Sequence, residues 1–254
     1  MKRAFFAALV ACSVAVAGDA GAETTAEDGQ GAHGAASPVV VELFTSQGCS
    51  ACPPADALLA EIAPRRDIIA LSLHVDYWDY LGWSDIFAQS AFTDRQRGYA
   101  RIAGERAVFT PQMIVAGATI LPDVTPAVLE GAIAAAAAHP AAPVRLQVRR
   151  QGEALHVALS AEAGPLPDGT VVQLVRYLPN VRVDIPQGEN AGRSFDYSNV
   201  VIAWNALGAW DGQGPRAFDV ALKGPEPAVV IVQAARETPD GPLPGPILAA
   251  ARVD

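Results

Sequence analysis

Cysteines, basic clusters and long apolar runs are all scarce in this chain of 254 residues. It has three cysteines, and 18 Lys and Arg stand against 27 Asp and Glu, which gives a net charge of −9. Nucleic-acid binding depends on clustered basic residues that neutralise phosphates, so this composition argues against a nucleic-acid partner. After the first residues no apolar run is long enough to cross a bilayer, so we expect no membrane span.

The first 22 residues have the pattern of a secretory signal peptide. A positively charged start, Met1-Lys2-Arg3, precedes an apolar run over residues 4–17, and small residues at 20–22 suit cleavage. Cleavage there removes Cys12, and the mature protein is expected to be periplasmic or secreted. The alternative is a lipoprotein cleavage box over residues 9–12, which would anchor the protein through Cys12.

Composition and periodicity divide the remainder into three parts. Residues 23–37 are small and polar without an apolar period, which is typical of a flexible linker. Residues 38–140 alternate strand-like and helical segments, which predicts an α/β domain with a helical insertion after its second strand. Residues 141–254 contain short strand-like runs between Gly, Pro and Asp turns, which predicts an all-β sandwich-like domain.

Several helix ends carry recognisable signals. The segment 55–66 places Ala55, Leu58, Leu59 and Ile62 on one helical face, and Pro64 stops it. In the insertion, Thr93 is the expected N-cap and Gly104 the expected C-terminal stop. A hairpin is expected to turn at Gly117. The helix after it is expected to have Thr125 as its cap, with His139 near its end, where Pro140 terminates it.

The pair Cys49 and Cys52 is the strongest chemical signal. It lies where the first strand leads into a helix, and the positive end of a helix dipole stabilises a thiolate. This spacing suits attack by the Cys49 thiolate and closure by Cys52 to a Cys49–Cys52 disulfide. A ring this small constrains the unfolded chain little, so a purely structural staple is disfavoured. Pro53 and Pro54 leave open whether the helix begins at Cys49 or after Cys52.

Glu42 and Thr110-Pro111 are the other candidates near the pair. Glu42 lies in an apolar strand, where an ionised, unpaired carboxylate is costly and its pKa should rise. It is either a proton acceptor for Cys52 or a position that reaches solvent or an arginine. Pro111 opens the third strand, and the loop before that strand is expected to face Cys49.

Several motifs together resemble one secreted bacterial family, the thioredoxin-like domain of unknown function 1223. They are VVELFTSQGCSACPPAD, HVDYWDYLGW, FTDRQRGYA, FTPQMIV and GENAGRS. The resemblance implies a thioredoxin-like fold for residues 38–140, a cis peptide bond before Pro111, and a Thr110 backbone that pairs with a substrate peptide.

We therefore expect an exported thiol–disulfide oxidoreductase that acts on protein or peptide thiols and disulfides and depends on an unknown redox partner. Because the cysteines carry the electrons, this chemistry needs no bound cofactor. Thr110, Pro111 and Trp78 are expected to line the substrate groove. Trp78 belongs to an aromatic stretch that either packs on the sheet or forms a wall that receives a partner peptide.

Two other functions remain open from the sequence. His74 ends the second strand, and two thiolates with one imidazole suit Cu(I) or Zn(II), so Cys49, Cys52 and His74 could serve a periplasmic metal chaperone. Otherwise His74 is a rim histidine or an acid–base partner. In the third reading the cysteines rest as a disulfide in a non-catalytic binding module. The GENAGRS segment, residues 188–194, is either a polar hairpin loop or a docking element.

Overall fold

Strands dominate the computed structural model, which describes residues 37–138, 144–161, 165–167, 169–239 and 241–253. The predicted signal peptide, nearly all of the predicted linker, His139 and Pro140 lie outside these residues. The elements in chain order are β1 (Val39–Thr45), α1 (Pro53–Ile62), β2 (Ile68–His74), the 3-10 helix η1 (Asp79–Leu81), α2 (Ser90–Ala103), β3 (Gln112–Val115), β4 (Thr119–Ile120), α3 (Pro126–Ala138), β5 (Val144–Gln151), β6 (Ala154–Ala161), β7 (Val171–Ile185), β8 (Arg193–Ala209), β9 (Arg216–Ala221), β10 (Ala228–Arg236) and β11 (Leu243–Val253).

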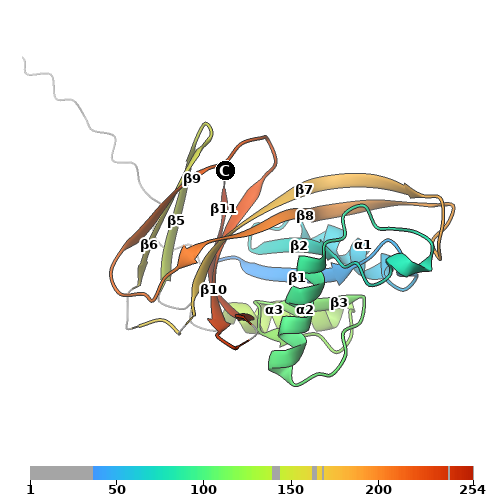
Figure 1. Cartoon of the computed structure of the whole chain (residues 1–254), viewed down its shortest axis with the longest axis horizontal. Coiled ribbons are helices and arrows are strands. Elements are labelled where there is room, and N and C mark those ends of the chain that lie inside the picture. Colours follow the sequence, from blue (N-terminus) through green and yellow to red (C-terminus); the bar gives the residue numbers. More distant parts are fainter. Residues whose placement is uncertain (1–36, 139–143, 162–164, 168, 240, 254) are drawn as a thin grey trace, which may run out of the picture. The chain divides into compact units, whose positions relative to one another are not determined.

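Strands from both halves of the chain share one sheet. Its order is β11-β10-β7-β8-β2-β1-β3-β4, and β5, β6 and β9 form a second, three-stranded sheet. β1 pairs with β2 in parallel, from Val39 opposite Ile68 to Thr45 opposite His74. The long β7–β8 hairpin joins this parallel pair through β8, where Val200 pairs with Ser72 of β2. Figure 1 shows the hairpin running alongside β2.

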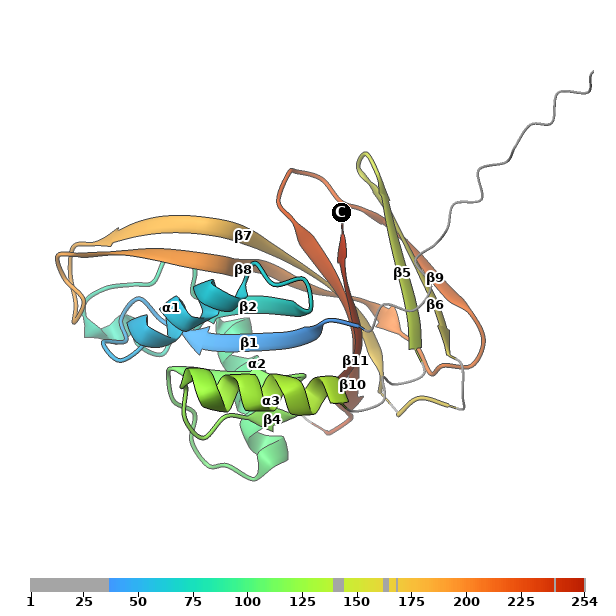
Figure 2. The same ribbon diagram turned by 180° about the vertical axis from the view of Figure 1, so that it is seen from behind.

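The helices cover opposite faces of the first half of the sheet. α1 and α3 lie on one face and α2 on the other, as Figures 1 and 2 show from opposite sides. Side chains of β1 alternate accordingly, because successive residues of a strand point to opposite faces. Leu43 packs in the cluster that contains Leu59 of α1, whereas Phe44 packs in the cluster that contains Tyr99 of α2.

The second sheet adds a layer over the strands of the C-terminal half. Leu155 and Val157 of β6 pack with Val172 of β7 and Val230 of β10 in a cluster that also holds Trp210. The expectation of an α/β half followed by a strand-rich half is confirmed at this level, and the result is a mixed α/β fold with 11 strands in the described ranges. No helix of the described residues is long and apolar enough to span a membrane.

The helix ends test the local signals individually. α1 begins at Pro53 with Cys52 as its N-cap, which decides between the two starts left open by the prolines. Gly104 ends α2 in the left-handed region, with φ of 76°, and the Thr125 Oγ1 accepts the backbone N–H of Val128 at the start of α3. The prediction for Thr93 is wrong, because α2 already begins at Ser90.

Thr93 instead fixes the loop after β2. Its hydroxyl donates a hydrogen bond to Asp76 Oδ1 at 2.6 Å and accepts one from the Asp76 backbone N–H at 3.2 Å. The N-cap of α2 is Gln89, whose backbone N–H donates to the carbonyl of His74. A side chain with a good capping preference thus serves a tertiary contact, and the helix starts one turn earlier.

Two helical glycines give a matched test of the packing between α2 and β11. A Cβ at Gly98 would lie 2.5 Å from the Pro244 Cδ, whereas a Cβ at Gly131 of α3 meets nothing within 4 Å. We expect Gly98→Ala to destabilise the fold by about 1–3 kcal/mol through overpacking, and Gly131→Ala to stabilise it by up to about 1 kcal/mol. Urea unfolding of both variants measures this. Equal stabilities would contradict the close approach of β11 to α2.

Candidate functional site: the Cys49–Cys52 pair

A disulfide joins Cys49 and Cys52 in the loop between β1 and α1. Their Cα atoms lie 5.4 Å apart. This bond confirms the predicted disulfide. The loop is held by backbone hydrogen bonds from Cys49 N–H to Ser46 O and from Cys52 N–H to Cys49 O. Both cysteines are buried, while Ser50 and Ala51 between them are exposed. The pair thus lies directly beneath an exposed dipeptide.

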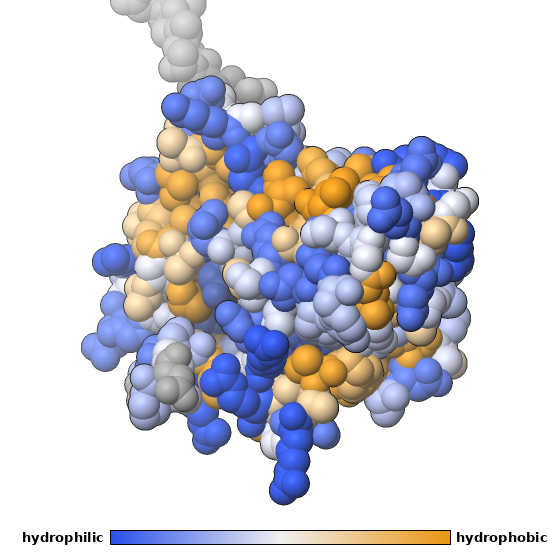
Figure 3. Space-filling model, turned by 45° about the vertical axis from the view of Figure 1, so that its right-hand side comes forward, coloured by the Kyte–Doolittle hydropathy of each residue, from blue (hydrophilic) through white to orange (hydrophobic). Residues whose placement is uncertain are grey.

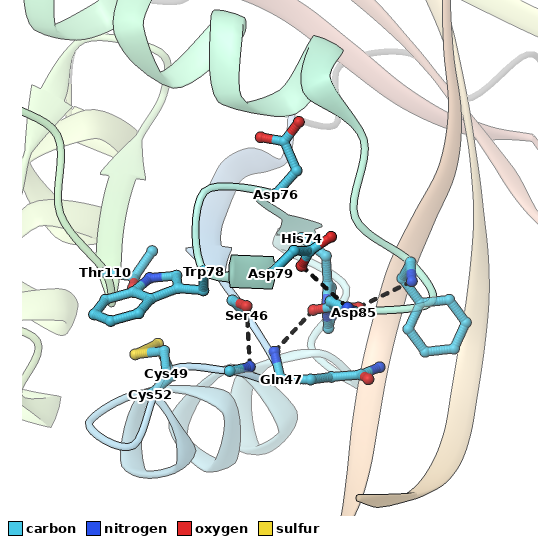
Figure 4. Close-up of polar contacts among 12 residues, drawn as sticks. Ser46, Gln47, Cys49, Cys52, His74, Asp76, Trp78, Asp79, Asp85 and Thr110 are labelled. Atoms are coloured by element: carbon cyan, nitrogen blue, oxygen red, sulfur yellow. Dashed lines mark hydrogen bonds and ion pairs between the residues drawn. A yellow bond between two sulfur atoms is a disulfide. The ribbon is translucent and has the colours of Figure 1, made fainter. Parts of the chain in front are cut away.

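Trp78 and Thr110 lie next to the pair, where sequence reasoning placed the substrate groove. The Trp78 Nε1–H donates to Thr110 Oγ1 at 2.8 Å, and the peptide bond between Thr110 and Pro111 is cis. A Cβ at Gly48, the residue before Cys49, would lie 3.0 Å from the Trp78 Cβ. Figure 4 shows the indole beside the two sulfur atoms, with Thr110 next to it. The aromatic stretch therefore reaches the cysteines.

The GENAGRS segment at the tip of the β7–β8 hairpin docks on the cysteine loop. The buried Asn190 donates its side-chain N–H groups to the carbonyls of Gln47, at 2.9 Å, and Cys49, at 3.1 Å. Beside it, the Ser50 hydroxyl donates to Glu189 Oε2 at 2.7 Å, and Arg193 donates to Asn190 Oδ1. Of the two interpretations of this segment, the structure therefore agrees with the docking element, which contacts the cysteine loop.

Glu42 does not approach Cys52, and its predicted role as proton acceptor needs correction. Its oxygens accept hydrogen bonds from Arg95 Nε and from the Tyr99 hydroxyl, each at 2.6 Å. Because it alternates with Leu43, it lies on the α2 face of the sheet, whereas α1 and Cys52 lie on the other face. Of the two readings of Glu42, the one in which it reaches an arginine is observed.

His74 is fully buried rather than on a rim. Its Nδ1 lies 2.7 Å from Asp85 Oδ2, and Asp85 also accepts the backbone N–H groups of Gln47 and Phe87 (Figure 4). A carboxylate that is ionised can only accept, and in that state of Asp85 the hydrogen between the two groups belongs to His74 Nδ1. The ring is held edge-on by Phe87 and Tyr197.

The residues of the alternative metal site are not arranged as a ligand set. Cys49 and Cys52 are bonded to each other, and the Nδ1 of His74 is engaged by Asp85. Among the residues that the structure describes, no group of three or more His, Cys, Asp or Glu side chains is placed to hold a metal ion.

Asp56 is a site residue that sequence reasoning missed. It lies on α1 one turn after Cys52 and is 7% exposed, and neither carboxylate oxygen has a hydrogen-bond partner among the described residues. Burial raises its pKa to about 7, although the nearby His74 and the hydroxyl of Thr45, which faces the carboxylate without hydrogen-bond geometry, oppose the rise. A signal was present: Asp56 is in helical phase with Leu59 on the apolar face of α1, where a carboxylate is unexpected.

Comparisons with known proteins agree with one assignment. The model of a family described as "Protein of unknown function (DUF1223)" matches residues 40–233. The chain belongs to the DUF1223 family. No curated protein matches it.

Two solved structures resemble this DUF1223 chain. A crystal structure of a protein from Agrobacterium tumefaciens is 30% identical, with a TM-score of 0.71, and the match covers 87% of this chain and 96% of that one. HBP35 of Porphyromonas gingivalis is 15% identical, with a TM-score of 0.55, and the match covers 85% of this chain and 74% of that one. The second likeness concerns the fold alone.

The Glu42–Arg95 contact gives a stability prediction. Arg95→Met leaves the carboxylate of Glu42 buried without its cation, and removing one partner of a buried pair typically costs about 3–5 kcal/mol. Arg97→Met on the same helix is the control, since Arg97 is exposed and should change stability by less than about 1 kcal/mol. Urea unfolding at neutral pH measures both. Similar losses in the two variants would contradict a buried pair that the fold requires.

Asp56 gives a prediction for stability against pH. Its pKa in the folded protein, about 7, exceeds its ordinary value of 3.8, so folding favours the protonated form. This preference destabilises the fold progressively as pH rises from about 4 to 7. Asp56→Asn removes the effect, so the stability of the variant relative to wild type should rise by on the order of 4 kcal/mol across that window.

Urea unfolding at a series of pH values measures the difference, because all other titrating groups are common to the two proteins. Glu61→Gln is the matched control, an exposed carboxylate on the same helix. The stability of that variant should run parallel to wild type. An Asp56→Asn curve that is also parallel would mean that folding does not shift the pKa of Asp56.

Proposed function

We propose that this protein is an exported thiol–disulfide oxidoreductase that acts on protein or peptide thiols and disulfides through Cys49 and Cys52. The observation that carries the proposal is the bonded pair at the start of α1 beneath the exposed Ser50 and Ala51. A structural staple would gain little from so small a ring. A reactive pair gains from the position, because thiolates are stabilised at helix N-termini.

Both prolines at the start of α1 shape this environment. Pro53 and Pro54 have no N–H, so two of the donors that a helix normally offers at its N-terminus are missing. The dipole of the helix remains, and Cys52 is the residue at its N-cap. Cys49 lies three residues earlier, directly before the exposed dipeptide, and is the sulfur that we assign to the attack on a substrate disulfide.

The walls beside the pair support a groove for an extended peptide. Trp78 and Thr110 are hydrogen-bonded to each other next to the sulfur atoms, and the peptide bond from Thr110 to Pro111 is cis. The order of β1, α1 and β2, followed by a cis-proline, the β3–β4 hairpin and α3, resembles the thioredoxin fold. In that comparison the backbone of Thr110 pairs with the substrate, and the groove is lined by Thr110, Pro111 and Trp78.

Two exposed aromatic side chains are close in sequence to the residues of this groove. Tyr80 is 79% exposed and Phe109 is 51% exposed, and each lies within two residues of the Trp78–Thr110 hydrogen bond. Apolar patches are interspersed with hydrophilic residues on the face that Figure 3 presents. Aromatic side chains of this kind are common in surfaces that receive a partner chain. They favour a protein or peptide as the substrate.

The site of action that we propose is the periplasm or the exterior, through the signal peptide at residues 1–22. An oxidising compartment permits the Cys49–Cys52 disulfide to form and persist. A lipid anchor at Cys12 is the alternative mode of export. The reaction cycle then requires a second redox partner that restores the cysteine pair after each turnover.

Trapping tests the proposal directly. Cys52→Ser removes the resolving thiol, so Cys49 should accumulate discrete mixed disulfides with its partners in the periplasm. Electrophoresis should show covalent adducts that disappear on reduction. Cys49→Ser is the matched control, because it removes the attacking sulfur from the same loop and should trap no partner.

Two outcomes are distinguished by this comparison. Adducts that depend on Cys49 and vanish with Cys49→Ser support the oxidoreductase. If Cys52→Ser traps nothing and the wild-type protein fails to reduce or oxidise any model dithiol or disulfide, the cysteine pair is not a working redox centre and the proposal fails.

A further inference from the structure

Unbonded polar atoms gather between α1 and the ends of β1 and β2. Buried polar groups in proteins are normally hydrogen-bonded, and exceptions need an explanation. Within the described residues, seven buried side-chain atoms have no partner, and six of them lie near this layer. They are Thr45 Oγ1, Gln47 Nε2, both carboxylate oxygens of Asp56, Ser72 Oγ and His74 Nε2.

The register of the strands brings these residues to one face. Thr45 of β1 pairs with His74 of β2, and Ser72 is two residues earlier on the same strand. Val41, Leu43, Ile68 and Ala70 alternate in phase with these three and pack in the cluster that contains Leu59 of α1. The unbonded groups therefore belong to the α1 face, where Asp56 is also buried.

Asp56 is positioned toward Cys52 by the helix itself. Its backbone N–H donates to the carbonyl of Cys52 at 3.1 Å, the ordinary bond between residues four apart in a helix. Side chains at this spacing are neighbours on one face. Cys52 is completely buried, so its thiol, once reduced, gives up a proton to the protein interior rather than to bulk water.

His74 brings a second unbonded group close to Asp56. Its Nδ1 is bonded to Asp85, and its Nε2 has no partner among the described side chains. Nε2 accepts a hydrogen bond when the ring is neutral and donates one when the ring is charged. A protonated Asp56 is a suitable donor for it, directly or through a water molecule. Asp85 is held in place by three hydrogen bonds, so the acceptor has a fixed orientation.

We propose that Asp56 accepts the proton of the Cys52 thiol when Cys52 closes the disulfide, with His74 as the positioning residue that binds the resulting carboxylic acid and Asp85 as the residue that orients His74. This inference rests on the proposed oxidoreductase and names the proton acceptor that Glu42 cannot be. Asp56 is placed for this role by its burial, its free oxygens and its position one turn after Cys52.

Closure of the Cys49–Cys52 disulfide releases the substrate. Cys49 is first joined to one sulfur of the substrate, and Cys52 carries a thiol. The S–H bond of Cys52 breaks and its proton moves to a carboxylate oxygen of Asp56. The Cys52 thiolate forms the bond to the Cys49 sulfur, and the bond from Cys49 to the substrate sulfur breaks. The substrate leaves as a thiolate and is protonated by water, so the substrate disulfide is reduced and the cysteine pair is oxidised.

Three titratable groups lie close to Asp56. They are His74 of β2, Asp85 in the loop after η1, and Tyr197 of β8, whose own pKa is raised by burial and by the charges of Asp56 and Asp85. The hydroxyl of Thr45 of β1 also faces the carboxylate. Burial is the largest influence on Asp56 and brings its pKa to about 7. A carboxyl group with that value can both accept and return a proton near neutral pH.

The experiment follows the two sulfurs separately. Reduced protein is mixed with an aromatic disulfide reagent that releases one coloured thiolate when Cys49 attacks and a second when Cys52 closes the ring. In wild type, the rate of the second phase should rise with pH and level off near pH 7, where Asp56 loses its proton. In Asp56→Asn it should be slower by about 100-fold at pH 7 and continue to rise toward the ordinary thiol pKa of about 8.5.

Glu61→Gln serves as the control, since it removes an exposed carboxylate from the same helix and should leave both phases unchanged. The first phase should persist in Asp56→Asn, because it depends on Cys49. A second phase with the wild-type rate and pH profile in Asp56→Asn would overturn the assignment of Asp56. Loss of the first phase in wild type, together with no trapping by Cys52→Ser, would instead overturn the oxidoreductase.

Infrared difference spectra of wild type supply a test that does not require the variant to fold. At pH 7, oxidation of the dithiol should produce the C=O stretch of a newly protonated carboxyl group, because the Cys52 proton ends on Asp56. If no such band appears and the wild-type second phase has no break near pH 7, the proton goes elsewhere and the inference is wrong.

Discussion

The buried ion pair between Glu42 and Arg95 stabilises the face of the sheet that α2 covers. The chemistry that we propose lies on the opposite face, which α1 covers. Taking both charges out of water is costly, so the pair is tolerable only with further hydrogen bonds. Tyr99 and Gln233 supply them, and the guanidinium of Arg95 stacks 3.8 Å from the ring of Trp204. Through these contacts α2, β1, β8 and β10 are held together across both halves of the chain.

The opposite face has the reverse character. Both carboxylate oxygens of Glu42 accept hydrogen bonds, whereas on the α1 face the Asp56 carboxylate has no partner among the described residues and the His74 ring has one. A fully bonded buried charge rigidifies a core, while an unbonded one keeps its proton exchangeable at a cost in stability. The Glu42–Arg95 pair on one face of the sheet therefore stabilises the fold. On the other face, Asp56 has a carboxyl group whose pKa is about 7.

Much of the fold could be predicted from local patterns, and the errors arise where tertiary contacts decide. The apolar phase of α1, the Gly104 stop and the Thr125 cap follow from periodicity and capping chemistry. Alternation along β1 predicts that Glu42 and its neighbours face opposite ways, but it does not say which side α1 will cover. Asp56 carried a local signal in its apolar phase, whereas the Asn190 contact joins residues 141 positions apart.

The Asn190 contact makes the cysteine loop a joint product of both halves. A chain that ended before residue 188 would keep both cysteines, α1 and the cis-proline, but would lose the two hydrogen bonds that hold the carbonyls of Gln47 and Cys49. Similarity confined to the first half is therefore insufficient evidence that another protein has this site. A substitution at the hairpin tip therefore bears directly on the cysteine loop, and the strand-rich half contributes to the site that we propose.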